Sequence, residues 1–71
     1  MRYAIVITEI DYYEEEPYGE YNKKTTLYQF KDNVQFIDDL AGALQIAREQ
    51  QRHRPNGFRY EVIEIGTSYI I

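Results

Sequence analysis

The spacing of apolar residues changes twice along this chain, and these changes constrain the fold most strongly. Residues 3–10 and 23–31 are rich in β-branched and aromatic types and alternate with the period of two that is typical of strands. After Asp32 the period lengthens to about 3.6 residues. One helical stripe then contains Ile37, Leu40, Ala41, Leu44 and Ala47. The period of two returns over residues 58–65, so the predicted order is β-β-α-β.

The first predicted strand carries apolar side chains on both of its faces. Tyr3, Ile5 and Ile7 share one face, and Ala4, Val6 and Ile10 share the other. A strand that is apolar on both faces is typical of the centre of a sheet. Residues 23–31 are expected to pair antiparallel to it. Residues 67–71 are also β-prone, and we expect a short fourth strand there, with continuation of the third strand past a bulge as the alternative.

The predicted helix has an ambiguous start and a clearer end. Either Asp32 or Asn33 caps it, with Gln35 completing a capping box after Asp32, or Asp38 caps a later start. At the other end, Arg48, Arg52, His53 and Arg54 complement the negative end of the helix dipole. The Pro-Asn-Gly sequence at 55–57 then stops the helix.

These elements predict an α+β fold: a small antiparallel sheet of three or four strands with one helix packed on one face. The 71 residues form a single compact domain, interrupted by a hairpin loop at 11–22. A chain of this size buries about 60–65% of the surface that it exposes when unfolded. Few residues can therefore be spared from packing to build a catalytic pocket.

Cysteine is absent from the sequence, which excludes a disulfide framework, a thiolate nucleophile and a Cys-based metal site. The apolar run near the N-terminus is interrupted by Glu9 and Asp11, so it is too short for the core of a signal peptide or for a membrane span. These features predict a cytoplasmic protein.

The most unusual feature is the segment 11–22, which we call the acidic loop. It contains five carboxylates, no basic residue and four of the eight tyrosines of the chain. Exposed tyrosines offer stiff contact area with a hydrogen-bonding tip, and carboxylates steer encounter with a basic surface. The alternative is a solvated hairpin tip whose charge prevents aggregation. The candidate binding residues are Tyr12, Tyr13, Glu14, Glu15, Glu16, Tyr18, Glu20 and Tyr21.

This loop predicts a small acidic, non-enzymatic protein-binding module whose partner is a protein with a basic surface. A nucleic-acid enzyme or a defence nuclease has such a surface, where the carboxylates would mimic nucleic-acid phosphates. In that case the chain is an inhibitor encoded by a virus or a mobile element. The net charge of −4 argues against a general binder of polyphosphates.

Two alternative functions remain open. Residues 48–59 contain four arginines and one glutamate, so a nucleic-acid-binding accessory domain could use phosphate contacts from Lys23, Lys24, Lys31, Arg48, Arg52, Arg54 and Arg59. The structural alternative for these arginines is an ordinary cationic helix end. The other function is that of a homodimeric structural protein, in which the strand ending in Tyr69, Ile70 and Ile71 pairs across a dimer edge.

Catalysis, metals and cofactors are not expected. His53 is the sole imidazole and has no neighbouring nucleophile or carboxylate in the sequence to orient it. The glycines are scattered singly, so there is no phosphate-binding loop. Consecutive carboxylates such as Glu14, Glu15 and Glu16 diverge rather than converge on a cation.

Overall fold

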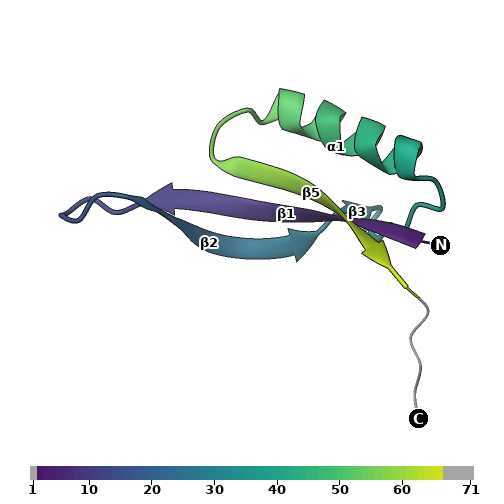
Figure 1. Ribbon diagram of the computed structural model, residues 1–71, viewed down its shortest axis with the longest axis horizontal. Coiled ribbons are helices and arrows are strands. Elements are labelled where there is room, and N and C mark those ends of the chain that lie inside the picture. The colour runs from purple at the N-terminus through teal and green to yellow at the C-terminus, as the bar shows by residue number, and fades with distance from the viewer. Residues whose placement is uncertain (1, 67–71) are drawn as a thin grey trace, which may run out of the picture.

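The structure is a computed structural model and describes residues 2–66 (Figure 1). Along the chain its elements are β1 (Arg2–Tyr12), β2 (Glu20–Leu27), β3 (Gln29–Phe30), β4 (Asn33–Val34), α1 (Leu40–His53) and β5 (Phe58–Ile65). The fourth strand expected at 67–71 lies outside the described residues. Within the described part, no helix is long and apolar enough to cross a membrane.

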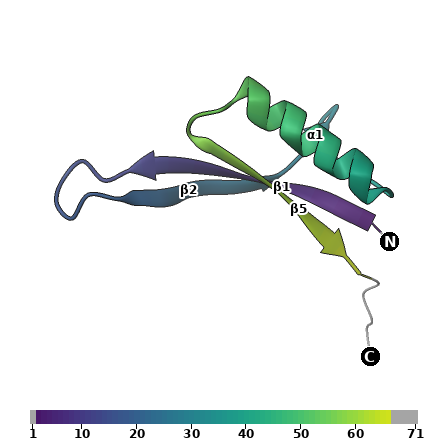
Figure 2. The same cartoon turned by 45° about the horizontal axis from the view of Figure 1, so that its top comes forward.

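Strand β1 is the centre of the main sheet, as its two apolar faces predicted. The strand order is β2-β1-β5, and both pairings are antiparallel. Helix α1 packs across β5 and β1 on one side of this sheet (Figures 1 and 2). The predicted α+β class is therefore confirmed, and a separate two-stranded hairpin, β3-β4, adds to it.

The register of the sheet shows which side chains face α1. Ile7 of β1 lies opposite Thr26 of β2 and Tyr60 of β5, and all three line one groove together with Gln50 of α1 and Arg54, the residue that follows the helix. Odd-numbered positions of β1 therefore face the helix, and even-numbered positions face the opposite side. Ile5, which is fully buried, lies on the helix side. Ala43 and Ala47 are the buried residues of α1, and their small side chains allow the helix to approach the sheet closely.

The helix begins later than it would with Asp32 or Asn33 as its N-cap. Asp39 is the N-cap: its backbone is extended, and its Oδ2 accepts a hydrogen bond from the Gly42 N–H at 2.9 Å. The starts at Asp32 and Asn33 were wrong, and the later start at Asp38 was one residue early. The reason is that Ile37, assigned to the helical stripe, extends the sheet instead, exchanging backbone hydrogen bonds of 2.7 and 2.9 Å with Tyr3.

The strand predicted at 23–31 was wrong at both ends. Strand β2 starts at Glu20 and ends at Leu27, after which Tyr28 donates a last backbone hydrogen bond to Ile5 O at 2.8 Å. The chain then turns through Lys31 and Asp32, whose φ angles of 52° and 65° lie in the left-handed region. Two successive positive φ angles are those of a type I′ hairpin turn, so residues 29–34 leave the main sheet as the β3-β4 hairpin.

The last strand agrees with the prediction at both ends. Helix α1 ends at His53, with Arg54 as the C-cap, and the connection to β5 passes through Gly57 at a φ of +80°. That conformation favours glycine, which has no Cβ to clash. Strand β5 then runs antiparallel along β1 from Glu9 to Arg2.

Candidate functional site

The acidic loop forms the end of the molecule that is farthest from the N-terminus of β1 (Figure 1). Strands β1 and β2 remain paired as far as Tyr12 and Glu20, whereas β5 reaches only to the level of Glu9. Residues 13–19, which we call the loop tip, therefore project from a two-stranded ribbon. A backbone hydrogen bond of 2.8 Å from Tyr13 N to Gly19 O closes this tip.

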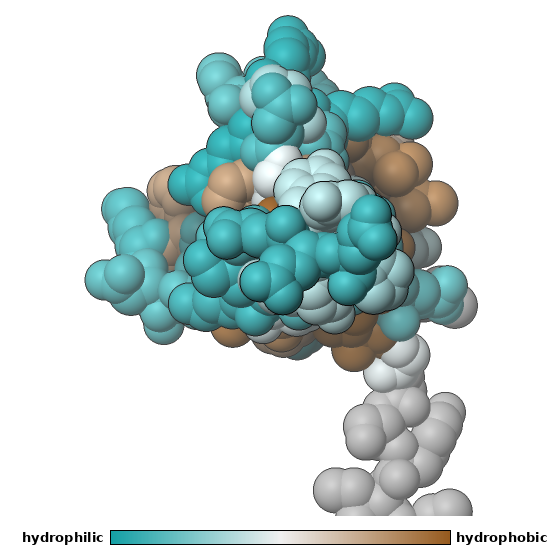
Figure 3. Space-filling view, turned by 90° about the vertical axis from the view of Figure 1, so that its left-hand side faces the viewer, coloured by the Kyte–Doolittle hydropathy of each residue, from teal (hydrophilic) through white to brown (hydrophobic). Residues whose placement is uncertain are grey.

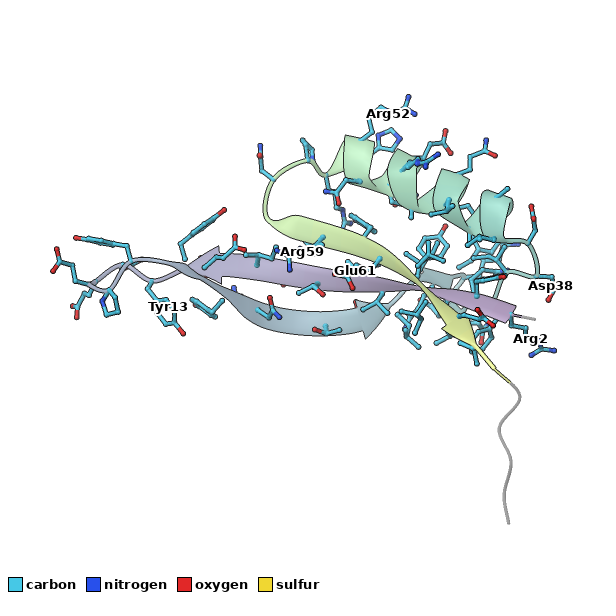
Figure 4. The ribbon with its side chains drawn as sticks, viewed as in Figure 1. Arg2, Tyr13, Asp38, Arg52, Arg59 and Glu61 are labelled. Atoms are coloured by element: carbon cyan, nitrogen blue, oxygen red, sulfur yellow. The ribbon has the colours of Figure 1, made fainter. Side chains whose placement is uncertain are left out.

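Three of the four loop tyrosines expose most of their surface. The exposed fractions are 61% for Tyr12, 54% for Tyr13 and 71% for Tyr18. Tyr21 is half-buried, and its ring lies against that of Tyr13 with 4.7 Å between the centroids. This contact holds the Tyr13 ring beside the hairpin (Figure 4). The loop therefore presents aromatic rings to solvent instead of contributing them to the core.

The carboxylates of the acidic loop divide into two groups. At its base, Glu20 Oε1 lies 3.1 Å from Arg59 Nη2, and Asp11 Oδ2 lies 4.0 Å from Lys23 Nζ. At the tip, Glu14, Glu15 and Glu16 are exposed, and none of them forms an ion pair with any described residue. The negative charge of the loop is thus concentrated at its tip, where Figure 3 shows a hydrophilic surface end-on.

An open concavity lies against the loop. It is lined by Asp11, Tyr21 and residues 12–17, a set that includes the three tip glutamates and both members of the Tyr13–Tyr21 pair. A concavity of this composition can accept a cationic side chain from a partner protein, because a cation gains both from carboxylates and from aromatic faces.

The four arginines predicted as a basic patch do not lie on one surface. Arg59 is opposite Thr8, on the face of the sheet away from α1, and pairs with Glu20. Arg48 and Arg52 are exposed on α1, and Figure 4 shows Arg52 well separated from Arg59. The guanidinium of Arg54 lies 4.9 Å from the centroid of the Phe58 ring. The structure therefore divides these cations between two faces.

A groove that the sequence did not indicate lies between β2 and the C-terminal half of α1. Its lining includes two cations and two tyrosines: Lys24, Arg54, Tyr28 and Tyr60. The groove exists because α1 packs over β5 and β1, which leaves the helix-side face of β2 uncovered. Its residues come from three distant segments, so no local pattern in the sequence could have revealed it.

The chain matches no protein-family model, no curated protein and no solved structure. Within residues 2–66, moreover, no group of three or more His, Asp or Glu side chains is placed to hold a metal ion.

Proposed function

We propose that this chain is a non-enzymatic protein-binding module that uses the acidic loop to bind a basic surface on another protein. One observation carries the proposal: Tyr12, Tyr13 and Tyr18 are exposed beside Glu14, Glu15 and Glu16, which have no cationic partner among the described residues. Exposed aromatic rings raise the risk of association, so a loop that serves solubility alone has no need of them.

The geometry of the loop suits contact with a protein. Tyrosine supplies large contact area at a low cost in conformational entropy, and the Tyr13–Tyr21 contact reduces that cost further. The unneutralised glutamates at the tip accelerate encounter with a positively charged surface. The ion pair between Glu20 and Arg59 joins the base of the loop to β5, which supports the ribbon on one side.

The more specific form of the proposal concerns the kind of partner. A protein that holds nucleic acid presents cations to successive phosphates. Three consecutive glutamates at the end of a narrow hairpin offer such a protein an alternative set of anions. The chain would then act as an inhibitor of a nucleic-acid enzyme or a defence nuclease, and a virus or a mobile element would be its source.

Affinity capture with matched variants tests this proposal. The wild type is compared with a Tyr12→Ala/Tyr13→Ala/Tyr18→Ala variant, a Glu14→Gln/Glu15→Gln/Glu16→Gln variant and an Arg52→Ala control on the exposed face of α1. We expect the wild type and the control to capture a partner that has a basic surface. The two loop variants should not capture it. Binding of the purified partner should weaken with salt. Full binding by the tyrosine variant would exclude the acidic loop as the contact surface.

The groove favours a second candidate function, the nucleic-acid-binding accessory domain. Lys24 and Arg54 line it together with Tyr28 and Tyr60, and cations beside aromatic rings are typical of single-strand binding surfaces. A titration with fluorescent single-stranded DNA and RNA at low salt tests this function. Binding that Lys24→Ala/Arg54→Ala abolishes and the tyrosine loop variant retains would favour the groove. Absence of binding at low salt would exclude it.

A further inference from the structure

The outer edge of β5 is capped along only half of its length. The Ile10 N–H donates to Gly57 O at 2.8 Å, and this register directs the backbone groups of Phe58, Tyr60, Val62 and Glu64 away from β1. The side chain of Gln51 occupies two of these groups: Nε2 donates to Phe58 O at 2.8 Å, and Oε1 accepts from Tyr60 N at 3.2 Å. No described residue bonds in this way to Val62 or Glu64.

Apolar side chains lie on both sides of the uncapped half. Leu44 is seven residues before Gln51 and so lies on the same stripe of α1, on the side of the β5 edge. Leu40, one turn earlier, exposes 46% of its surface. On the opposite face of the sheet, Ile63 exposes 41%. A solitary edge strand is normally protected by charge or by a bulge.

The other edge of the sheet has that protection. Strand β2 carries Lys23 and Lys24, and its register with β1 shifts between Glu9 and Ile10, at the position of Lys23. Strand β5 also carries charged residues, Glu61 and Glu64, but its register with β1 has no shift from Phe58 to Ile65, so it lacks the bulge that discourages pairing of β2 with another strand. The two edges of the sheet therefore differ, and the uncapped half of β5 is the one suited to pairing.

We propose that a second copy of this chain pairs antiparallel along residues 62–64 of β5. Val62 of each copy exchanges backbone hydrogen bonds with Glu64 of the other, and the two Ile63 side chains meet at the two-fold axis. The two neighbouring registers of such a pairing are less favourable. Pairing Glu64 with Glu64 opposes like charges, and pairing Val62 with Val62 requires the Tyr60 N–H, which Gln51 already occupies.

The same register also brings residues of opposite charge from the two copies together on the helix side of the sheet. Arg48 follows Leu44 by one turn of α1 and is exposed. Gln51 bonds to Phe58 and Tyr60 at the start of β5, and α1 runs antiparallel to this strand, so the helical turns before Gln51 lie over the stretch that follows Tyr60 (Figure 1). Glu64 of one copy, placed opposite Val62 of the other, therefore comes near the Leu44–Arg48 turn of that other copy. Each interface therefore contains two Arg48–Glu64 pairs of opposite charge and an apolar contact between the Leu40 and Leu44 side chains of the two helices. A chain that carries both halves of such a pair is self-complementary.

Analytical ultracentrifugation of the full chain over a wide concentration range tests the proposal. We expect a concentration-dependent dimer in the wild type, with the dissociation constant raised at least about tenfold by Ile63→Lys. The matched control is Val34→Lys, which places the same charge on a similarly exposed residue of the β3-β4 hairpin and should leave the dimer intact. Circular dichroism verifies that both variants fold.

Charge exchange provides the second measurement. Arg48→Glu and Glu64→Arg should each weaken the dimer, and the double variant should restore it, since it re-forms the pair with reversed signs. The Tyr12→Ala/Tyr13→Ala/Tyr18→Ala loop variant should still dimerise, so this outcome is independent of the proposed function. A wild-type monomer at every concentration, or dimerisation that Ile63→Lys leaves unchanged, would overturn the proposal, as would a β5 edge occupied solely by a strand of another protein.

Discussion

The side-chain oxygen of Gln51 accepts a hydrogen bond from the backbone N–H of Tyr60 at 3.2 Å, while its nitrogen donates to Phe58 O at 2.8 Å. One amide on α1 thus bonds to β5 as a neighbouring strand would. The helix therefore stabilises the sheet in two ways. It covers one face of the sheet with Ala43 and Ala47, and it closes the edge of β5 that is nearest to the 54–57 connection.

The first prediction concerns this edge. Gln51→Ala should lower the free energy of unfolding by about 1–2 kcal/mol, because it leaves Phe58 O and the Tyr60 N–H without their partner. Gln45→Ala removes the same side chain from an exposed position of α1 and should change stability little. Urea unfolding followed by circular dichroism measures both. Equal effects of the two substitutions would show that the amide does not stabilise the edge.

The second prediction separates two adjacent carboxylates at the start of α1. Asp39→Ala removes the acceptor of the Gly42 N–H and should destabilise the protein by about 1 kcal/mol. Asp38→Ala, one residue earlier and exposed, should cost much less. The midpoints of thermal unfolding of the two variants provide the comparison, and a larger loss for Asp38→Ala would place the cap at Asp38, the latest of the three starts that the sequence left open.

The third prediction tests how closely α1 packs on the sheet. Ala43 is fully buried, so Ala43→Leu inserts a larger side chain where the helix meets the strands and should cost about 1–3 kcal/mol. Ala41→Leu places the same side chain on the exposed surface of the helix and should be nearly neutral. A stable Ala43→Leu variant would mean that the helix can move away from β1 and β5 without loss.

Much of the fold was predictable from periodicity. The central position of β1 followed from its two apolar faces, and the limits of β5 agreed with the predicted strand. Periodicity could not assign Ile37, because a single apolar residue fits a helical stripe and an edge strand equally well. Its assignment depends on a long-range pairing with Tyr3, which no local signal reports.

The candidate site was predictable in part. Clustering in the sequence located the acidic loop, but it could not show which of the carboxylates form ion pairs. Arg59 is far from Glu20 in the sequence, and the two residues come together only through the pairing of the strands. The same reasoning grouped Arg59 with the arginines of α1, although the pleat of β5 places it on the opposite face. The groove between β2 and α1 required the packing of the helix to be known.

The final prediction concerns the turn that the sequence did not reveal. Asp32 has a φ of 65°, a conformation in which a Cβ atom is sterically strained and in which glycine, without a Cβ, is not. Asp32→Gly should therefore stabilise the β3-β4 hairpin by about 0.5–1 kcal/mol. Asn33→Gly provides the neighbouring control: Asn33 lies in β4, where glycine weakens a strand, and the change also removes the hydrogen bond from Asn33 Nδ2 to Lys31 O.

Hydrogen exchange at the Gln35 amide reports on this hairpin directly, because that N–H donates to Tyr28 O at 3.0 Å across its base. Exchange should slow about two- to fivefold in Asp32→Gly and accelerate in Asn33→Gly, in line with a change of 0.5–1 kcal/mol in the opening free energy. An amide at the centre of β1 that bonds across the sheet, such as Val6, should respond less, because its exchange requires the three-stranded sheet to open. Faster exchange at Gln35 in Asp32→Gly would contradict the turn geometry on which β3 and β4 depend.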